Sequence, residues 1–83
     1  MGREINKRLL VSISLRLKEL RKERDLSQEA FYNDTGINIG RLERAKRDFS
    51  MTTLESICSY LDITMEEFFR GVKYAKGKTK KAR

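Results

Sequence analysis

Apolar residues in the first third of the chain recur at the spacing of a helix. The positions concerned, separated by four or three residues, are Ile5, Leu9, Ile13, Leu17 and Leu20. This spacing puts them on one helical face, while charged residues such as Arg16, Glu19 and Glu23 occupy the other. The pattern predicts an amphipathic helix over about residues 5–24.

A glycine separates the next two predicted helices. Ser27 is a good N-cap, because its hydroxyl can accept a hydrogen bond from a free backbone amide one turn later, and a helix should follow over about residues 28–35. Gly36 stands where helices commonly end in a left-handed residue. Asn38 can cap a third helix over about residues 38–45. Two short helices around a sharp turn form a helix-turn-helix, whose second helix fits the major groove of DNA.

A buried stripe marks the fourth predicted helix. Its members, at positions i, i+3, i+4 and i+7, are Leu54, Ile57, Cys58 and Leu61. They predict a helix over about residues 53–61. Either Ser50 or Thr52 can serve as the N-cap, and Thr52 also makes a capping-box pattern with Glu55.

The fifth predicted helix completes an all-α domain. Thr64 and Glu67 form a second capping-box pattern, which opens a short helix over about residues 65–70. No segment alternates as a half-buried strand requires, and proline is absent. Five short helices joined by short links predict one orthogonal five-helix domain over residues 1–70.

Positive charge is unevenly distributed along the chain. The 83 residues carry a net charge of +7, but residues 71–83 hold six lysines and arginines and no acid. We expect those last residues to form a mobile basic tail. Residues 41–47 carry four bases and one acid, whereas residues 48–70 carry five acids and one base. The charge of the body is therefore concentrated at the third predicted helix, which favours a nucleic-acid partner.

The composition excludes most catalytic and metal sites. Histidine is absent and Cys58 is the single cysteine, so no intrachain disulfide, His-based metal site or Cys–His catalytic pair can form. We expect Cys58 to be a small buried apolar residue. The neighbouring carboxylates Glu66 and Glu67 diverge on a helix, and residues 36–40 are not followed by the lysine and hydroxyl of a phosphate-binding loop. No enzyme activity, metal or cofactor is expected.

No segment suggests export or membrane insertion. No apolar run approaches the roughly 20 residues that span a bilayer. The basic N-terminal residues 1–10 are not followed by an uninterrupted apolar core or a small-residue cleavage site. We expect a cytoplasmic protein with no membrane contact.

Several short motifs resemble the Xre/phage-repressor helix-turn-helix family. They are Ser27-Gln28-Glu29, Gly36-Ile37-Asn38, Leu42-Glu43-Arg44 and Lys46-Arg47, with residues 17–21 before them and residues 50–54, 61–63 and 67–68 after them. The resemblance spans roughly residues 13–70 and extends to the small controller proteins of restriction–modification systems. It implies a lambda-repressor-like domain that binds operator DNA, usually as a two-fold dimer.

Two features depart from the pattern of that family. Only four residues, 38–41, lie between Ile37 and Leu42. This is about three fewer than the resemblance implies, so the recognition helix should be nearly one turn shorter. Tyr32 stands where the family prefers a small residue. We expect the two departures to be coupled, with the tyrosine filling the space that the lost turn leaves.

The candidate DNA-contacting residues surround the predicted turn and the helix after it. They are Gln28, Asn38, Gly40, Arg41, Arg44, Lys46 and Arg47. The resemblance assigns Gln28 to a DNA phosphate, and a glycine at position 40 permits close approach of the backbone. Arg41 should project outward, where its guanidinium could pair with guanine or hold a phosphate. The three later cations are predicted to contact phosphates.

One ion pair is expected to be structural. Glu43 matches a family glutamate that pairs with an arginine of the first helix, here Arg21. The pair should hold the recognition helix against the scaffold.

A dimer contact is predicted at the fifth helix. Phe68 and Phe69 point about 100° apart on a helix, so both cannot face one core equally. Phe69, with Met65 and Val72, could therefore contact a second subunit. Tyr60 either joins that surface or covers the core.

Two functions remain open at this level. The first is an operator-binding transcriptional regulator that acts on double-stranded DNA as a homodimer. The second is a protein-interaction or antitoxin-like module that retains the scaffold. Convergence of the four cations of residues 41–47 on one face with Gln28 would favour DNA.

Overall fold

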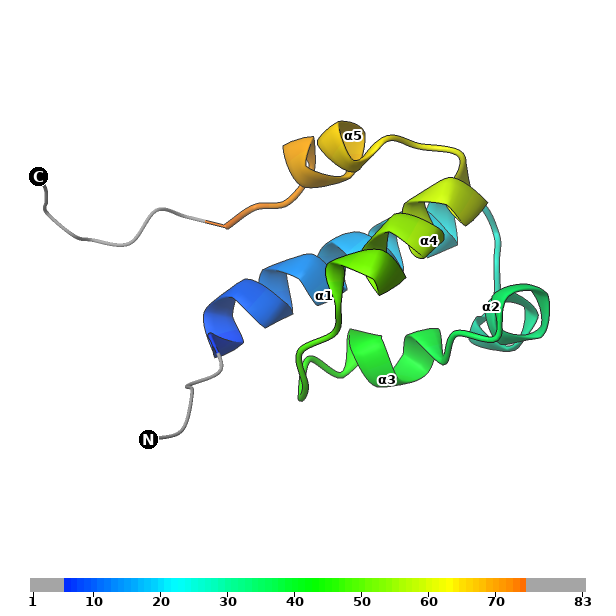
Figure 1. Ribbon diagram of the computed structural model, residues 1–83, viewed down its shortest axis with the longest axis horizontal. Coiled ribbons are helices and arrows are strands. Elements are labelled where there is room, and N and C mark those ends of the chain that lie inside the picture. The colour runs from blue at the N-terminus through cyan, green and yellow to red at the C-terminus, as the bar shows by residue number, and fades with distance from the viewer. Residues whose placement is uncertain (1–5, 75–83) are drawn as a thin grey trace, which may run out of the picture.

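The described part of the chain folds into five helices, which confirms the predicted all-α class. The computed structural model describes residues 6–74, and these contain helices and no strand. The helices are α1 (Lys7–Glu23), α2 (Gln28–Thr35), α3 (Ile39–Glu43), α4 (Met51–Leu61) and α5 (Met65–Arg70). In Figure 1, α1 crosses the middle of the molecule, with α3 on one side of it and α5 on the other.

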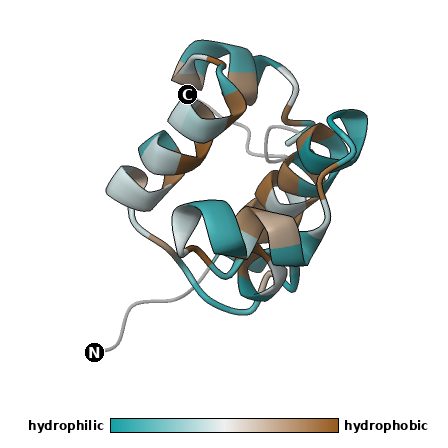
Figure 2. Ribbon diagram, turned by 90° about the vertical axis from the view of Figure 1, so that its right-hand side faces the viewer, coloured by the Kyte–Doolittle hydropathy of each residue, from teal (hydrophilic) through white to brown (hydrophobic). Residues whose placement is uncertain are grey.

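One hydrophobic core joins all five helices. Its buried members are Ile13, Leu17, Leu20, Phe31, Ile39, Leu54, Ile57, Cys58, Leu61 and Phe68. The hydrophobic positions lie on the sides of the helices that face one another, while hydrophilic positions face outward (Figure 2). Phe31 and Phe68 are fully buried, and burying such a side chain stabilises the fold by about 1.5–3 kcal/mol.

Each helix begins at a polar N-cap whose side chain accepts from a backbone amide. The five caps are Asn6, Ser27, Asn38, Ser50 and Thr64. Glu67 completes the predicted capping box, since the Thr64 amide donates to its carboxylate at 2.8 Å. That hydrogen bond lowers the pKa of Glu67.

Some predicted helix boundaries are wrong by one to two residues. α1 begins at Lys7 and not at residue 5, because Asn6 is its cap; residues 1–5 lie outside the described part. α3 ends at Glu43, because Arg44 caps it and Ala45 turns away at a φ of 58°. α4 begins at Met51 because Ser50 is its cap. The predicted capping box between residues 52 and 55 is therefore wrong.

Arg16 of α1 and Arg24, the C-cap of α1, bind the carboxyl ends of two other helices. Arg16 donates from Nε to the carbonyl of Phe68 and from Nη2 to that of Glu67, both at 2.9 Å. Arg24 donates to the carbonyl of Leu61 at 3.3 Å. The last carbonyls of a helix lack intrahelical partners and carry partial negative charge, so cations there stabilise α5 and α4 against α1.

The packed unit continues beyond α5. The side-chain amide of Asn6 donates to the hydroxyl of Tyr74 at 3.0 Å, and the Arg8 guanidinium lies 4.8 Å from the centre of the Tyr74 ring. Val72 packs against the core. These contacts return residues 72–74 to the start of α1, beyond the boundary expected at residue 70. The rest of the expected tail, residues 75–83, lies outside the described residues.

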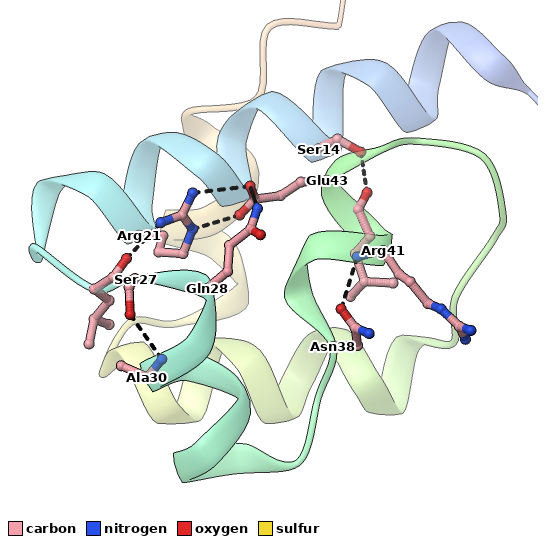
Figure 3. Close-up of polar contacts among 10 residues, drawn as sticks. Ser14, Arg21, Ser27, Gln28, Ala30, Asn38, Arg41 and Glu43 are labelled. Carbon is pink, nitrogen blue, oxygen red and sulfur yellow. Dashed lines mark hydrogen bonds and ion pairs between the residues drawn. The ribbon is translucent and has the colours of Figure 1, made fainter.

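A buried ion pair holds α3 against α1. Arg21 donates from Nε to Glu43 at 2.8 Å and from Nη2 to the other carboxylate oxygen at 3.2 Å (Figure 3). The side chains are 9% and 3% exposed. Arg21 also donates to the carbonyl of Leu26, and buried Ser14 donates to that of Leu42, both at 2.7 Å. The sequence-predicted pair is thus bidentate and surrounded by further bonds to the same scaffold.

Replacing Gly71 with alanine should destabilise the fold through Arg16. A Cβ at this position would lie 2.2 Å from the Arg16 guanidinium carbon, so the arginine would have to leave the carbonyls of α5. We expect Gly71→Ala to lower the free energy of unfolding by about 1–2 kcal/mol in urea denaturation. In an Arg16→Ala background the same change should cost less than about 0.5 kcal/mol. Equal costs in both backgrounds would contradict this coupling.

Breaking the Arg21–Glu43 pair should lower the free energy of unfolding far more than breaking an exposed ion pair. Glu43→Gln keeps the shape but leaves the Arg21 cation buried and uncompensated, so we expect unfolding to become easier by about 3–5 kcal/mol. The matched control is Glu66→Gln, because the Glu66–Arg70 side chains are 81% and 68% exposed; its cost should be about 0.3–0.5 kcal/mol. Chemical denaturation of both variants measures the difference, and similar costs would show that α3 is held by other contacts.

Candidate nucleic-acid interface

The turn between α2 and α3 is closed by three hydrogen bonds. Gly36 has a left-handed conformation (φ 76°), and its amide donates to the carbonyl of Tyr32 at 2.7 Å. The Thr35 hydroxyl donates to the carbonyl of Phe31 at 2.8 Å and accepts from the Ile37 amide at 2.9 Å. These bonds fix the direction in which the chain enters α3, and glycine adopts the required φ at no steric cost.

Gly40 of α3 lies against the side chain of Gln28 on α2. A Cβ at this position would lie 3.0 Å from Oε1 of Gln28. The other end of that carboxamide donates to Glu43 at 3.1 Å. Figure 3 shows Gln28 reaching from α2 to the same carboxylate that Arg21 holds. The absence of a side chain at position 40 therefore lets Gln28 join the network that positions α3.

Asn38 has a defined structural role at the start of α3. Its side-chain oxygen accepts from the Arg41 amide at 3.2 Å, as the sequence predicts. The residue is exposed, so its side-chain amide stays on the surface beside the start of the helix.

The four predicted basic residues gather at one place. Arg41, Arg44, Lys46 and Arg47 are all exposed, and they line one surface hollow together with Leu42 and Asp48. The Arg41 side chain extends away from α3 and from the ion pair behind it (Figure 3). Within residues 6–74, none of the four cations forms an ion pair. Gln28 does not line the hollow; it lies against Gly40 instead.

Ala45 shapes this basic surface, and sequence reasoning missed it. It adopts a φ of 58° and is 6% exposed. A left-handed conformation costs a non-glycine residue roughly 1–2 kcal/mol, and burial of the methyl group offsets part of that cost. The turn reverses the chain between Arg44 and Lys46. Alanine is a strong helix former, so nothing in the local sequence indicates the turn.

The expectation that Tyr32 fills the space left by the short α3 is wrong. Tyr32 is 53% exposed, whereas the core residues Phe31 and Ile39 are 0% and 1% exposed. α3 contains only five residues. It is too short to cover the tyrosine, and the core between the helices is already occupied.

The residues expected to form a dimer contact are not equally exposed. Phe69 is 40% exposed and packs edge-on against Phe68, with 5.2 Å between ring centres. Met65 and Val72 are partly buried against the core. Tyr60 covers the core instead of joining this surface, because its ring lies 4.9 Å from that of Phe31. Its hydroxyl donates to Asp34, and this bond raises the pKa of Tyr60.

Metal ligands, the cysteine and the helix lengths complete the description of residues 6–74. Residues 6–74 contain no group of three or more potential metal ligands. Cys58 is buried, and that burial raises the pKa of its thiol. None of the helices in this stretch has the length and apolar character needed to cross a bilayer.

Comparison with known proteins agrees with this geometry. The model of the Cro/C1-type HTH DNA-binding domain matches residues 16–73. The chain is also 39% identical over 61 residues to a protein of Mycoplasma sp named "Control protein C.MunI", covering 69% of this chain and 82% of that protein. Residues 16–73, which match the family model, contain α2, the turn, α3 and the basic hollow. The chain belongs to the Cro/C1-type helix-turn-helix family of DNA-binding transcription regulators.

Proposed function

We propose that this protein is a sequence-specific transcriptional regulator, of repressor or controller type, that places α3 in the major groove of operator DNA. The observation that carries the proposal is the set of four exposed cations, without an ion pair in residues 6–74, around one hollow at the end of α3. Similarity to a protein named a control protein supports the regulatory role. The buried pair behind α3 supports it too, because a preorganised helix binds at a lower entropic cost.

The residues divide between base and backbone contacts. Arg41 extends away from α3 in Figure 3 and is the proposed base-reading residue, because guanidinium matches the acceptors of guanine. Arg44, Lys46 and Arg47 surround the same hollow and would contact phosphates. Gln28 uses one N–H for Glu43, and its second N–H would donate to a phosphate. Asn38 lies beside it, while Gly40 acts through Gln28.

The proposed active species is a homodimer. Helix-turn-helix dimers place two recognition helices about 34 Å apart, one turn of the duplex. Phe69 is the exposed apolar residue of α5, with Met65 and Val72 partly buried beside it. Because α5 lies on the other side of α1 from α3 (Figure 1), a contact there would leave both basic surfaces open to DNA.

DNA recognition predicts two separable effects of mutation. After selection of a bound duplex from a random library, Arg41→Ala should weaken the free energy of DNA binding by about 1–3 kcal/mol and relax the preference at one base pair. Replacing Arg44, Lys46 or Arg47 should instead weaken binding to all DNA sequences alike. Each replacement should reduce the slope of the log binding constant against the log salt concentration by about 0.9. Arg70→Ala is the control, since it removes an exposed cation from α5. A parent protein that binds no duplex at low salt, yet co-purifies with a protein partner, would overturn the proposal.

The dimer contact predicts loss of self-association on truncating Phe69. In sedimentation equilibrium, Phe69→Ala should be monomeric at concentrations where the parent is dimeric, because it removes the exposed apolar ring. Met51→Ala is the matched control, since Met51 is 61% exposed but lies at the start of α4. If the parent is monomeric throughout, or if both variants dimerise equally, α5 is not the interface.

A further inference from the structure

Tyr32 is a large exposed aromatic residue in the second half of α2. It follows Gln28 by four residues on α2, so the two side chains lie on one helical face about 6 Å apart along the axis. Gln28 rests against Gly40 at the start of α3. The face that carries Tyr32 therefore borders the helix proposed to enter DNA, and the ring remains 53% exposed there.

The hydroxyl of Tyr32 differs from those of the other two tyrosines. Tyr60 donates to Asp34, and Tyr74 accepts from Asn6. Within residues 6–74, no hydrogen bond involves the Tyr32 hydroxyl. A single exposed aromatic residue is ordinary on a protein surface, but this one combines an unused donor with a position one helical turn from Gln28, the proposed phosphate contact of α2.

We propose that Tyr32 is a DNA-backbone contact, whose hydroxyl donates a hydrogen bond to a phosphate oxygen at the edge of the groove that α3 enters. The inference rests on the proposed function. The first helix of a helix-turn-helix crosses the DNA backbone, and uncharged donors such as tyrosine commonly bind phosphates there. Because α3 has only five residues, it leaves the ring uncovered, and the ring extends the contact surface along α2.

A neutral phosphate contact has a distinctive signature. Tyr32→Phe keeps the ring and removes only the hydroxyl. We expect it to weaken binding roughly tenfold, equally for the selected duplex and for each single-base variant of it. The log–log salt slope should not change, because no counterion is released by a neutral donor. Arg44→Ala provides the comparison, since losing a cation should reduce that slope by about 0.9.

Tyr60→Phe is the matched control, because it removes the same hydroxyl from α4, where the donor is already used by Asp34. Its DNA affinity should equal that of the parent. Thermal unfolding of Tyr32→Phe should also match the parent, since the exposed hydroxyl has no hydrogen-bond partner among residues 6–74. An unchanged DNA affinity for Tyr32→Phe would overturn the contact, and a loss confined to one base pair would overturn its assignment to the backbone.

Fluorine NMR gives a direct second measurement. The chain has three tyrosines and no tryptophan, so 3-fluorotyrosine labelling yields three resonances that the Phe variants assign. We expect only the Tyr32 resonance to shift when the duplex is added. If the parent binds DNA and the Tyr32 resonance does not move, this inference fails while the proposed function survives. If the parent binds no duplex, both fail.

Discussion

The arrangement depends on one buried ion pair between α1 and α3. A five-residue helix has little stability of its own, since isolated helices shorter than about 12 residues are marginal in water. α3 exists as an element because Glu43 binds Arg21 on α1 and Gln28 on α2, while Ser14 holds the carbonyl at the end of the helix. The carboxylate side chain is only 3% exposed. It links the three elements that must keep a fixed relation for α3 to enter a groove.

Two groups of cations in the described part of the chain have different roles. Arg16 and Arg21 of α1, with its C-cap Arg24, bind carbonyls or a carboxylate inside the fold. The cations of residues 41–47 have no acidic partner within the described part and share one hollow. Net charge does not distinguish these two groups, but the presence or absence of a bound carbonyl or carboxylate does. Unpaired, clustered cations on a rigid support are what a polyanion such as DNA requires.

Local chemistry predicted most of the fold, whereas contacts between distant residues did not follow from it. The caps at Ser27 and Asn38 and the left-handed Gly36 depend on a few neighbouring residues, and all are confirmed. The space around Gly71 depends on Arg16, which is distant in sequence. Likewise, the position of Tyr32 depends on where α3 stops. A pattern of residue types can indicate which face of a helix is apolar, but not what the opposite face will meet.

We infer that the surface of α3 and its following turn, held by the Arg21–Glu43 pair, is the surface that meets DNA. Titration of the ¹⁵N-labelled protein with a selected duplex would show which amides the DNA affects. We expect the largest amide shifts in residues 38–47 and at the start of α2, with little change in α5. Shifts concentrated in α4 and α5, with residues 38–47 unmoved by saturating duplex, would contradict it.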